Sequence, residues 1–393
     1  MKKHDVIVIG GGPGGSVLGT YLGREGIDVG IIERAAFPRF KIGESLLPFS
    51  MDIFREIGFF DTLDSGRYMR KFGAQFIHHS SEEEIYFEFQ NGLDQNHGMA
   101  FEVERAEFDR DLLKHAEKSG AKIYQPEAVR DVELLENGVR VTTNKDEYEA
   151  KYLADASGRS AFMGNKHKLR HPNPDLNNLG VFAHYSGVTR NPGKREGDIT
   201  VGLLEDQRWI WIIPFVGDKT SVGVVGPSRT VAAHELDTYI EDAIAESPIL
   251  KKRMANAERM TEVSAVANYS NTSEAIVGDR WILNGDAAMF LDPVFSSGVH
   301  VSISTAKFSA EVIAKGLKDG ISLRTPGLGD IYEKRVRTGV NRFHSLISLF
   351  YNTNFVRQMT KTFNLKNTKE AFTSIVAGDV WNDDNFVFSK GVL

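Results

Sequence analysis

The chain has 393 residues, 41% of them hydrophobic and 25% charged, a composition typical of a soluble globular protein with room for two or three lobes. The net charge of −6 argues against a nucleic-acid partner, and the absence of Cys excludes disulfides, thiolate metal sites and Cys nucleophiles. Because Met1 leads directly into a strand pattern and no run of about 18 apolar residues occurs, we expect a cytoplasmic protein without a signal peptide or an integral membrane segment.

The first residues predict a strand, a glycine loop and a helix in close succession. An apolar strand at 5–9 precedes glycines at the spacing G-x-G-x-x-G, and a helix is expected over 16–24. In this arrangement the first Gly allows a tight turn, the second lets the backbone approach a pyrophosphate, and the third lets helix and strand pack closely. The helix N-terminus adds free N–H groups and the positive end of its dipole. The predicted dinucleotide contacts here are Gly10, Gly12, Pro13 and Gly15.

A second apolar strand, residues 28–32, ends at Glu33. At this position a carboxylate accepts hydrogen bonds from the ribose hydroxyls of a dinucleotide. Arg34 follows directly and is included in the predicted site. The glycine motif alone is weak evidence, but here it stands inside a complete β-α-β order, which favours a dinucleotide site over a structural glycine turn.

The next elements alternate between helix and strand patterns. A loop at 37–48 precedes a helix near 49–57, and strands at 72–76 and 84–89 precede a helix at 104–119. A short strand is expected at 122–124, a hairpin at 129–134 and 139–143 around an Asn-Gly turn, and a buried strand at 152–156.

The pattern changes in the middle of the chain. Short β runs at 180–188, 198–204, 209–215 and 221–225 predict an inserted antiparallel sheet. Helices are expected at 231–246 and 248–257, a buried strand at 281–284 and a long helix at 298–315. An amphipathic helical tail follows at 330–363, and 366–393 predicts a short helix with an irregular end.

Three further segments make the dinucleotide site more specific. Asp155 opens the sequence D-A-S-G-R-S after a strand, Arg105 begins a helix, and Asp286 ends a Gly-Asp pair between a strand and a long helix. With the N-terminal unit, and in this order, these segments resemble the fingerprints of the class A FAD monooxygenases, the para-hydroxybenzoate hydroxylase-like superfamily. The resemblance implies FAD as cofactor, with Asp286 bonded to its ribityl chain and Arg105 in contact with it. Each segment alone can be explained as an ordinary turn or helix start. Their order along the chain matches that of the family and therefore favours it.

The resemblance also implies the fold class, which is α/β. We expect an FAD-binding Rossmann-type domain with an inserted antiparallel β-sheet substrate domain and a helical C-terminal tail. Residues 1–75, 104–175 and 271–329 are assigned to the FAD-binding domain. Residues 76–103 and 176–270 are assigned to the substrate domain, and 330–393 to the helical C-terminal region.

Within that superfamily the chain resembles the flavin-dependent halogenases. The sequence W-I-W-I-I-P at 209–214 fits their W-x-W-x-I-P signature, and F-L-D-P-V-F-S-S-G at 290–298 fits F-x-x-P-x-x-S-x-G. The loop at 37–48 resembles the P-R-x-x-I-G-E-S stretch of members with phenol or acyl substrates, so Ser45 joins the predicted cofactor contacts. Lys71 stands where that branch carries its lysine, five residues before Phe76.

The two tryptophans have a physical reading beside the resemblance. Trp209 and Trp211 are two apart on a strand, so both indoles point to one face while Ile210 and Ile212 point to the other. Two such rings would wall the flavin from the organic substrate and prevent direct oxygen transfer. The alternative is a pair of core-facing aromatic residues in an aromatic-rich sheet.

The segment from Pro293 to Gly298 leads into a predicted helix. Backbone N–H groups at such an end form a cradle for an anion. The anion is either the negative edge of reduced flavin, contacted by Pro293, Gly298 and Val299, or a halide near Ser297 and Gly298. The flavin interpretation is shared by the superfamily, whereas the halide interpretation rests on the halogenase resemblance.

Lys71 is the predicted catalyst on that resemblance. Its amine would capture or hydrogen-bond hypohalite and deliver electrophilic halogen to the substrate. A free amine requires a lowered pKa, which burial supplies and which the neighbouring Arg70 would assist by charge repulsion. The competing interpretation is a solvated Arg-Lys pair on the surface. The histidines, including His300, show no metal-ligand spacing and are interpreted as structural or surface residues.

Three hypotheses follow. The first is a two-component halogenase-like oxygenase that uses reduced FAD, O2 and halide on an aromatic or other electron-rich small molecule, free or attached to a carrier. A separate flavin reductase is expected, because only one dinucleotide fingerprint occurs. The second is a flavin hydroxylase or a dehydrogenase/reductase similar to geranylgeranyl reductases, although the Cys-containing loop of those reductases is absent. The third is a flavin-binding scaffold without catalysis.

Overall fold

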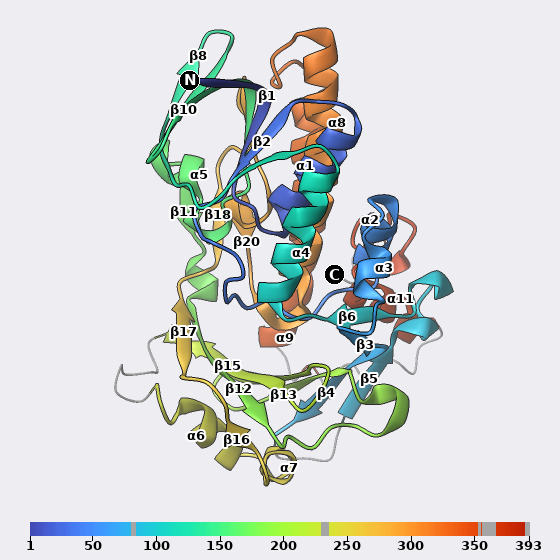
Figure 1. Cartoon of the computed structure of the whole chain (residues 1–393). Coiled ribbons are helices and arrows are strands. Elements are labelled where there is room, and N and C mark those ends of the chain that lie inside the picture. The colour runs from blue at the N-terminus through green and yellow to red at the C-terminus, as the bar shows by residue number, and fades with distance from the viewer. Residues whose placement is uncertain (80–83, 229–235, 353–354, 356–366, 390–393) are drawn as a thin grey trace.

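The computed structural model describes residues 1–79, 84–228, 236–352, 355 and 367–389. Two sheets lie at opposite ends of the molecule, with the N-terminal, mostly parallel sheet at the top of Figure 1 and a mostly antiparallel sheet at the bottom. Helix α8 (Ser297–Asp319) packs against α1 (Pro13–Arg24) in the upper lobe. The confirmed fold class is thus α/β, with an FAD-binding type domain, a second sheet and C-terminal helices.

The upper sheet has seven strands in the order β7-β2-β1-β10-β9-β8, with β19 paired to β10. The strands β7, β2, β1, β10 and β19 are parallel, and β8 and β9 form the predicted antiparallel hairpin. Their cores are apolar runs, as expected for strands covered on both faces. The bounds are β1 Lys2–Ile9, β2 Val29–Ile32, β7 Lys122–Tyr124, β8 Val129–Leu135, β9 Gly138–Thr143, β10 Glu147–Asp155 and β19 Trp281–Leu283.

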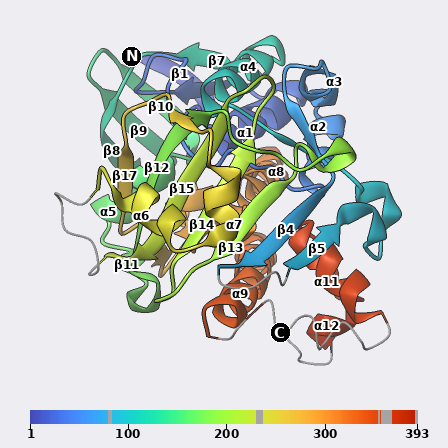
Figure 2. The same cartoon turned by 90° about the horizontal axis from the view of Figure 1, so that it is seen from below.

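The lower sheet has eight strands in the order β16-β12-β15-β14-β13-β4-β5, with β17 paired to β12. Only the β13–β4 pairing is parallel. Helices α6 (Tyr239–Ala245) and α7 (Pro248–Arg253) cover its outer face in Figure 2. The strand bounds are β4 Gly73–His78, β5 Glu84–Glu88, β12 Asn178–Ser186, β13 Ile199–Leu203, β14 Trp209–Pro214, β15 Thr220–Pro227, β16 Glu258–Arg259 and β17 Ser264–Ala267.

The remaining elements join the two lobes and cover one edge. A short antiparallel pair, β3 with β6, lies beside β5, and β11-β18-β20 form a three-stranded sheet. Helices α9 and α11 lie near the β4–β5 edge in Figure 2, and α11 contacts β5. The bounds are β3 Met69–Lys71, β6 Ala100–Glu102, β11 Arg170–Pro172, β18 Asn271–Ser273, β20 Met289–Phe290, α2 Ser50–Glu56, α3 Phe60–Leu63, α4 Arg105–Lys118, α5 Phe162–Lys166, α9 Gly329–Asn352, α11 Thr368–Val376 and α12 Phe386–Ser389.

Most predicted elements are present, and two of the helices differ in extent. The structure also contains short elements that were not predicted, namely the strands β3, β6, β11, β16, β17, β18 and β20 and the helices α3 and α5. The helix expected over 231–246 is observed as α6, which begins at Tyr239, while 229–235 lie outside the described residues. The tail helix expected to 363 is observed as α9 to Asn352, and 353–354 and 356–366 are likewise outside them. No helix of the described part is long and apolar enough to cross a membrane. The domain boundaries and the cytoplasmic location stay predictions.

Candidate functional site

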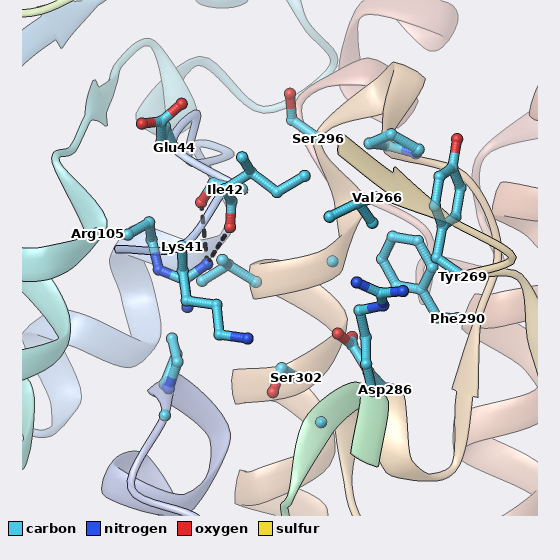
Figure 3. A pocket seen from close by; sticks show the side chains of 18 of the residues that line it. Lys41, Ile42, Glu44, Arg105, Val266, Tyr269, Asp286, Phe290, Ser296 and Ser302 are labelled. Atoms are coloured by element: carbon cyan, nitrogen blue, oxygen red, sulfur yellow. Dashed lines mark hydrogen bonds between the residues drawn. The ribbon is translucent and has the colours of Figure 1, made fainter. Parts of the chain in front are cut away.

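A cavity of about 420 Å³ extends from the glycine loop of the upper lobe to the inner face of the lower sheet. Figure 3 shows it from close by, with Lys41 and Arg105 on one side and Asp286 and Phe290 on the other. The predicted site residues that line it are Gly10, Gly12, Pro13, Glu33, Ser45, Arg105, Trp209, Trp211, Asp286, Pro293, Gly298 and Val299. The predicted residues outside its lining are Gly15, Arg34, Lys71 and Ser297.

The glycine loop leaves space for backbone contact with a ligand. Gly10 has a φ of +101°, and a Cβ on Gly15 would lie 1.9 Å from the Gly10 carbonyl oxygen. A Cβ on Gly12 would meet only the Arg39 guanidinium, at 3.7 Å. Gly12 is also the N-cap of α1 and makes no side-chain cap, so the helix N-terminus faces the cavity with free N–H groups. Gly15 therefore acts through packing, and Gly10 and Gly12 shape the cavity.

Glu33 lies at the end of β2, as predicted, and is buried. Its two carboxylate oxygens accept hydrogen bonds from the Gly11 and Ala35 backbone N–H groups, both at 2.8 Å. Each oxygen retains a lone pair for a further donor, which suits a ribose hydroxyl. Arg34 is exposed and does not line the cavity, so the structure gives it no contact there.

Cationic side chains surround the middle of the cavity. Arg105 holds Asp109 with two hydrogen bonds of 2.8 and 3.0 Å and donates to the Ile42 carbonyl, while Arg39 donates to the same carboxylate at 2.9 Å. Lys41 points into the cavity in Figure 3, and burial together with nearby arginines lowers its pKa. These groups fit the pyrophosphate of a dinucleotide, which would balance their charge.

Arg39, Lys41 and Glu44 line the cavity but were not among the predicted contacts. All belong to the loop whose P-R-x-x-I-G-E-S pattern was recognised in the sequence, and that motif was the signal that could have found them. Arg159, from the D-A-S-G-R-S segment, also lines the cavity.

Asp286 lies in a single 3₁₀ turn, Gly285–Ala287, after β19. It is partly buried at the cavity wall, and burial raises its pKa to about 6 against the opposing charge of Arg105 and Arg159. Its carboxylate faces the cavity in Figure 3. That position fits hydrogen bonding to the hydroxyls of a ribityl chain, as the family resemblance implies.

Trp209 and Trp211 line the lower end of the cavity with their ring centroids 5.8 Å apart. Ile210 and Ile212 pack in the separate core under α6 and α7, so the predicted alternation of faces is confirmed. The Trp209 indole donates to Tyr351 Oη at 2.8 Å, and the Trp211 indole to a Ser hydroxyl on β15. Both rings are therefore fixed by polar contacts as well as by packing.

The segment before α8 is held by a buried carboxylate. Asp292 accepts hydrogen bonds from Asn178, from Tyr351 and from the Val294 backbone N–H, each at 3.1 Å, and burial raises its pKa to about 6. This network joins the start of α8 to the end of α9 and, through Tyr351, to Trp209. Pro293, Gly298 and Val299 reach the cavity from this segment, whereas the Ser297 side chain is buried outside its lining.

Lys71 is buried just behind the cavity wall. Its Nζ donates to Ser45 Oγ at 2.7 Å and to the Leu46 carbonyl at 3.0 Å, and lies 4.0 Å from Glu102 Oε1. Ser45 itself lines the cavity, so one side chain separates the amine from it. The lysine and the indoles thus lie on the same side of the molecule, and the interpretation of Lys71 as a solvated surface residue is wrong.

Burial sets the protonation of this lysine. It lowers the pKa of Lys71 and raises the pKa of Glu102, while the charge of each residue opposes the shift of the other. The expected help from Arg70 is wrong: its side chain is 56% exposed and pairs with Asp64 at 2.7 Å. On strand β3 the two neighbours point to opposite sides, so Arg70 is exposed and Lys71 is buried.

His300 lies outside this cavity, with both ring nitrogens hydrogen-bonded at 2.9 Å, to Ser50 and to the Gly378 carbonyl. Burial lowers its pKa to about 4. No group of His, Cys, Asp or Glu that could hold a metal ion occurs among the described residues.

Comparisons with known proteins agree with this geometry. A family model described as FAD binding domain matches residues 3–335. The 1H-pyrrole-2-carbonyl-(peptidyl-carrier protein) chlorinase of Pseudomonas fluorescens is 31% identical over 388 residues, covering 91% of this chain and 86% of that protein. The flavin-dependent brominase Bmp2 is similar in structure, with a TM-score of 0.88 and 28% identity over 100% of this chain and 98% of that one. A flavoprotein/dehydrogenase from Cytophaga hutchinsonii gives a TM-score of 0.88 and 28% identity over 98% and 96%.

The relatives favour the halogenase prediction over the hydroxylase or geranylgeranyl reductase-like alternative. The match of the FAD-binding model also confirms the predicted cofactor. The chain belongs to the flavin-dependent halogenases of the FAD-binding monooxygenase family, and it is an FAD-dependent, halogenase-like enzyme.

Proposed function

We propose that this enzyme halogenates an electron-rich aromatic small molecule and that Lys71 delivers the halogen. The observation that carries the proposal is the position of the Lys71 amine, which is buried and one hydroxyl, that of Ser45, away from a cavity walled by Trp209 and Trp211. A buried amine with a lowered pKa can be nucleophilic near neutral pH, whereas an exposed lysine is protonated.

The proposed reaction uses reduced FAD, O2 and a halide. FAD in its reduced form, when bound, supplies with O2 the two-electron oxidation that converts a halide and a proton to hypohalous acid and water. The Lys71 amine then forms an N–X bond as the O–X bond breaks and its proton leaves with the oxygen as water. In the next step the halogen moves to a ring carbon, and the ring proton returns to the amine nitrogen.

The remaining residues have supporting roles in this proposal. The paired indoles exclude the organic substrate from the flavin end of the cavity, so that only small ions and hypohalite pass. Gly10, Gly12, Glu33, Arg105 and Asp286 hold the cofactor. A halide at Ser297 and Gly298 stays a prediction, and the buried position of Ser297 does not favour it.

The substrate and the source of electrons complete the proposal. The Pseudomonas relative is named for a pyrrole carried on a peptidyl carrier protein, and we propose a carrier-bound aromatic acyl group for this chain as well. A separate flavin reductase is proposed because the sequence has one dinucleotide fingerprint, which the cofactor itself would occupy. NADH alone should then leave the enzyme-bound FAD oxidised, and adding a flavin reductase should reduce it.

The direct test supplies chemically reduced FAD, O2 and bromide with a panel of phenols, pyrroles and indoles, offered free and as carrier thioesters. Mass spectrometry should detect products in which one bromine replaces one hydrogen. Complete oxidation of the FAD without any brominated product across the panel would contradict the proposal.

A further inference from the structure

A buried carboxylate from a distant part of the chain holds the backbone that follows Lys71. Asp198 is 2% exposed and lies directly before β13, which pairs in parallel with β4. Its Oδ1 accepts hydrogen bonds from the Phe72 N–H at 2.7 Å and from the Gly73 N–H at 2.9 Å. These two N–H groups belong to the residues directly after Lys71, where β3 ends and β4 begins.

We propose that Asp198 is a positioning residue for the Lys71 amine. Its carboxylate fixes the backbone directly after the lysine and thereby directs the amine toward Ser45. Asp198 does not line the cavity that the two tryptophans wall, so it acts through the peptide backbone. The inference rests on the proposed function, since it concerns the residue that delivers the halogen there.

The carboxylate of Asp198 is itself held from the opposite side. Its Oδ2 accepts a hydrogen bond from the Tyr86 hydroxyl on β5 at 2.8 Å. A Cβ on Gly73 would lie 2.5 Å from the Tyr86 ring, so the glycine leaves the space that this ring occupies. The Arg195 guanidinium covers the same ring, 3.9 Å from its centroid. With three donors on its two oxygens, the carboxylate is held in one orientation.

The turn before Asp198 lies directly against the strand that carries the lysine. A Cβ on Gly197 would lie 2.0 Å from the Arg70 carbonyl oxygen and 2.7 Å from the Met69 side chain. Glycine therefore allows the close approach of the turn to β3. This approach brings Asp198 within hydrogen-bonding distance of the peptides that follow Lys71.

The groups that accept from the amine are anchored separately, by β6. Ser45 forms an antiparallel bridge to that strand, and the Leu46 N–H donates to the Phe101 carbonyl at 3.0 Å. A lysine side chain has four rotatable bonds, so the amine reaches both acceptors reproducibly only if the backbone at its base is also fixed. Asp198 supplies that fixed base for Lys71.

Two substitutions separate the geometry of the Asp198 carboxylate from its charge. Asp198→Asn keeps an oxygen at the position of Oδ1, which can accept from both N–H groups, but removes the charge. Asp198→Glu keeps the charge but moves the carboxylate by about one carbon–carbon bond, roughly 1.5 Å. Glu196→Gln is the control, because it removes a 55% exposed carboxylate from the same turn.

Amide hydrogen exchange on the FAD-loaded full chain, followed by mass spectrometry, reports these hydrogen bonds without turnover. The peptide that contains Phe72 and Gly73 should be protected in the wild type, Glu196→Gln and Asp198→Asn. It should exchange at least about tenfold faster in Asp198→Glu, because both N–H groups lose their acceptor. Equal exchange in the wild type and Asp198→Glu would overturn the proposal.

Single turnovers with reduced FAD, O2 and bromide then compare an arene with a small diketone trap that consumes free hypobromite. Asp198→Glu should lose arene bromination at least about tenfold while trap bromination stays at the wild-type level, because a misplacement of about 1 Å costs up to about 100-fold in rate. Asp198→Asn should brominate the arene at close to the wild-type rate. The rates are compared above the acidic limb of the pH profile, since the charge of Asp198 raises the pKa of Lys71.

Two results of these turnovers would overturn the proposal. One is wild-type arene bromination by Asp198→Glu, and the other is a loss in Asp198→Asn as large as that in Asp198→Glu. Asp198→Ala covers the case in which the longer side chain unfolds the protein, and it should lose the arene product in the same way; wild-type arene bromination by this variant would also overturn the proposal. Circular dichroism and FAD content confirm that each variant is folded.

Lys71→Met separates a failure of this inference from a failure of the proposed function. If Lys71→Met brominates the arene like the wild type, the proposed function fails, while the exchange result for Asp198 stands. If Lys71→Met loses arene bromination but Asp198→Glu retains it, the proposed function stands and the positioning role of Asp198 is wrong.

Discussion

At the residue scale the Lys71–Glu102 pair bears most directly on the proposed halogen transfer. Both side chains are almost completely buried, and their nitrogen and oxygen lie 4.0 Å apart. Burial favours the neutral form of each, so the pair resists carrying a full charge on both members. Glu102 was not predicted from the sequence, because its partner is 31 positions away on another strand and nothing in the local pattern marks it.

Replacing Glu102 tests this coupling through a pH profile. The charge of Glu102 raises the pKa of Lys71, so Glu102→Gln should lower that pKa and populate the free amine at lower pH. The acidic limb of the halogenation rate should therefore move to lower pH, while FAD binding stays at the wild-type level. A limb that stays in place or moves to higher pH would show that the amine is not the titrating group.

The predicted residues and the overlooked ones differ in the kind of signal they carry. Trp209 and Trp211 were predictable because strand alternation fixes their face, and Glu33 because a strand end fixes its place. Arg39 and Lys41 lie in an irregular loop, where no periodic pattern indicates which side chains point into the cavity. Burial of Lys71 could not be read from composition, since Arg70 beside it is exposed.

At the element scale the β1–α1 junction forms part of the proposed cofactor site. A Cβ on Gly15 would lie 1.9 Å from the Gly10 carbonyl oxygen, which is backbone and cannot move aside without shifting the helix. Gly15→Ala should therefore weaken FAD binding at least about 100-fold, because the helix N-terminus would leave the pyrophosphate position. Equilibrium dialysis or flavin fluorescence on the isolated variant measures this.

Gly180→Ala is the matched control. A Cβ there would meet its nearest neighbour, Val225 Cγ2, at an ordinary 3.6 Å, and the position lies in the lower sheet on β12. It should bind FAD like the wild type. Similar losses in both variants would mean that general destabilisation, and not the glycine loop, explains the effect.

Helix α8 also places a titratable group in the core. Folding lowers the pKa of His300 from 6.5 to about 4, so the unfolded chain binds more protons there as pH falls below 6.5. Protonation of His300 in the unfolded chain should lower the free energy of unfolding by about 2 kcal/mol when the pH falls from 7.5 to 5, because each pKa unit corresponds to about 1.4 kcal/mol.

Denaturant unfolding at the two pH values compares the wild type with His300→Gln, which keeps a polar side chain without the titration. The loss of unfolding free energy on acidification should be about 2 kcal/mol smaller in the variant. An equal loss in both proteins would contradict the assignment.

Among the helices and strands, some could be predicted from the sequence and others could not. The β-α-β unit, the 129–143 hairpin and the inserted sheet were predictable, because each has its own local period or turn. The parallel pairing of β13 with β4 was not, since these strands are separated by more than 100 residues and pair through the fold. The start of the helix expected at 231–246 was not predictable, because 236–238 form a turn and α6 begins only at Tyr239.

At the scale of the whole molecule the C-terminal region completes the site. Tyr351, at the end of α9, contacts both the Trp209 indole and Asp292 before α8, although these lie in different lobes. A cavity of about 570 Å³ is likewise lined by residues of α2, α8, α9 and the segment near 380. Such assemblies have no local sequence signal, so the cofactor fingerprints and the tryptophan pair could be predicted, whereas the contacts made by the C-terminal region could not.

The account depends on transfer of halogen through the buried amine of Lys71. Its most direct measurement is a single turnover with chemically reduced FAD, O2 and bromide, in which mass spectrometry quantifies brominated arene and brominated diketone trap for Lys71→Met and Arg70→Met. Arg70→Met changes the exposed neighbour and should brominate the arene like the wild type. Lys71→Met should still oxidise bromide into the trap but lose arene bromination by at least about 100-fold, the scale of a missing catalytic group. Wild-type arene bromination by Lys71→Met would contradict the account.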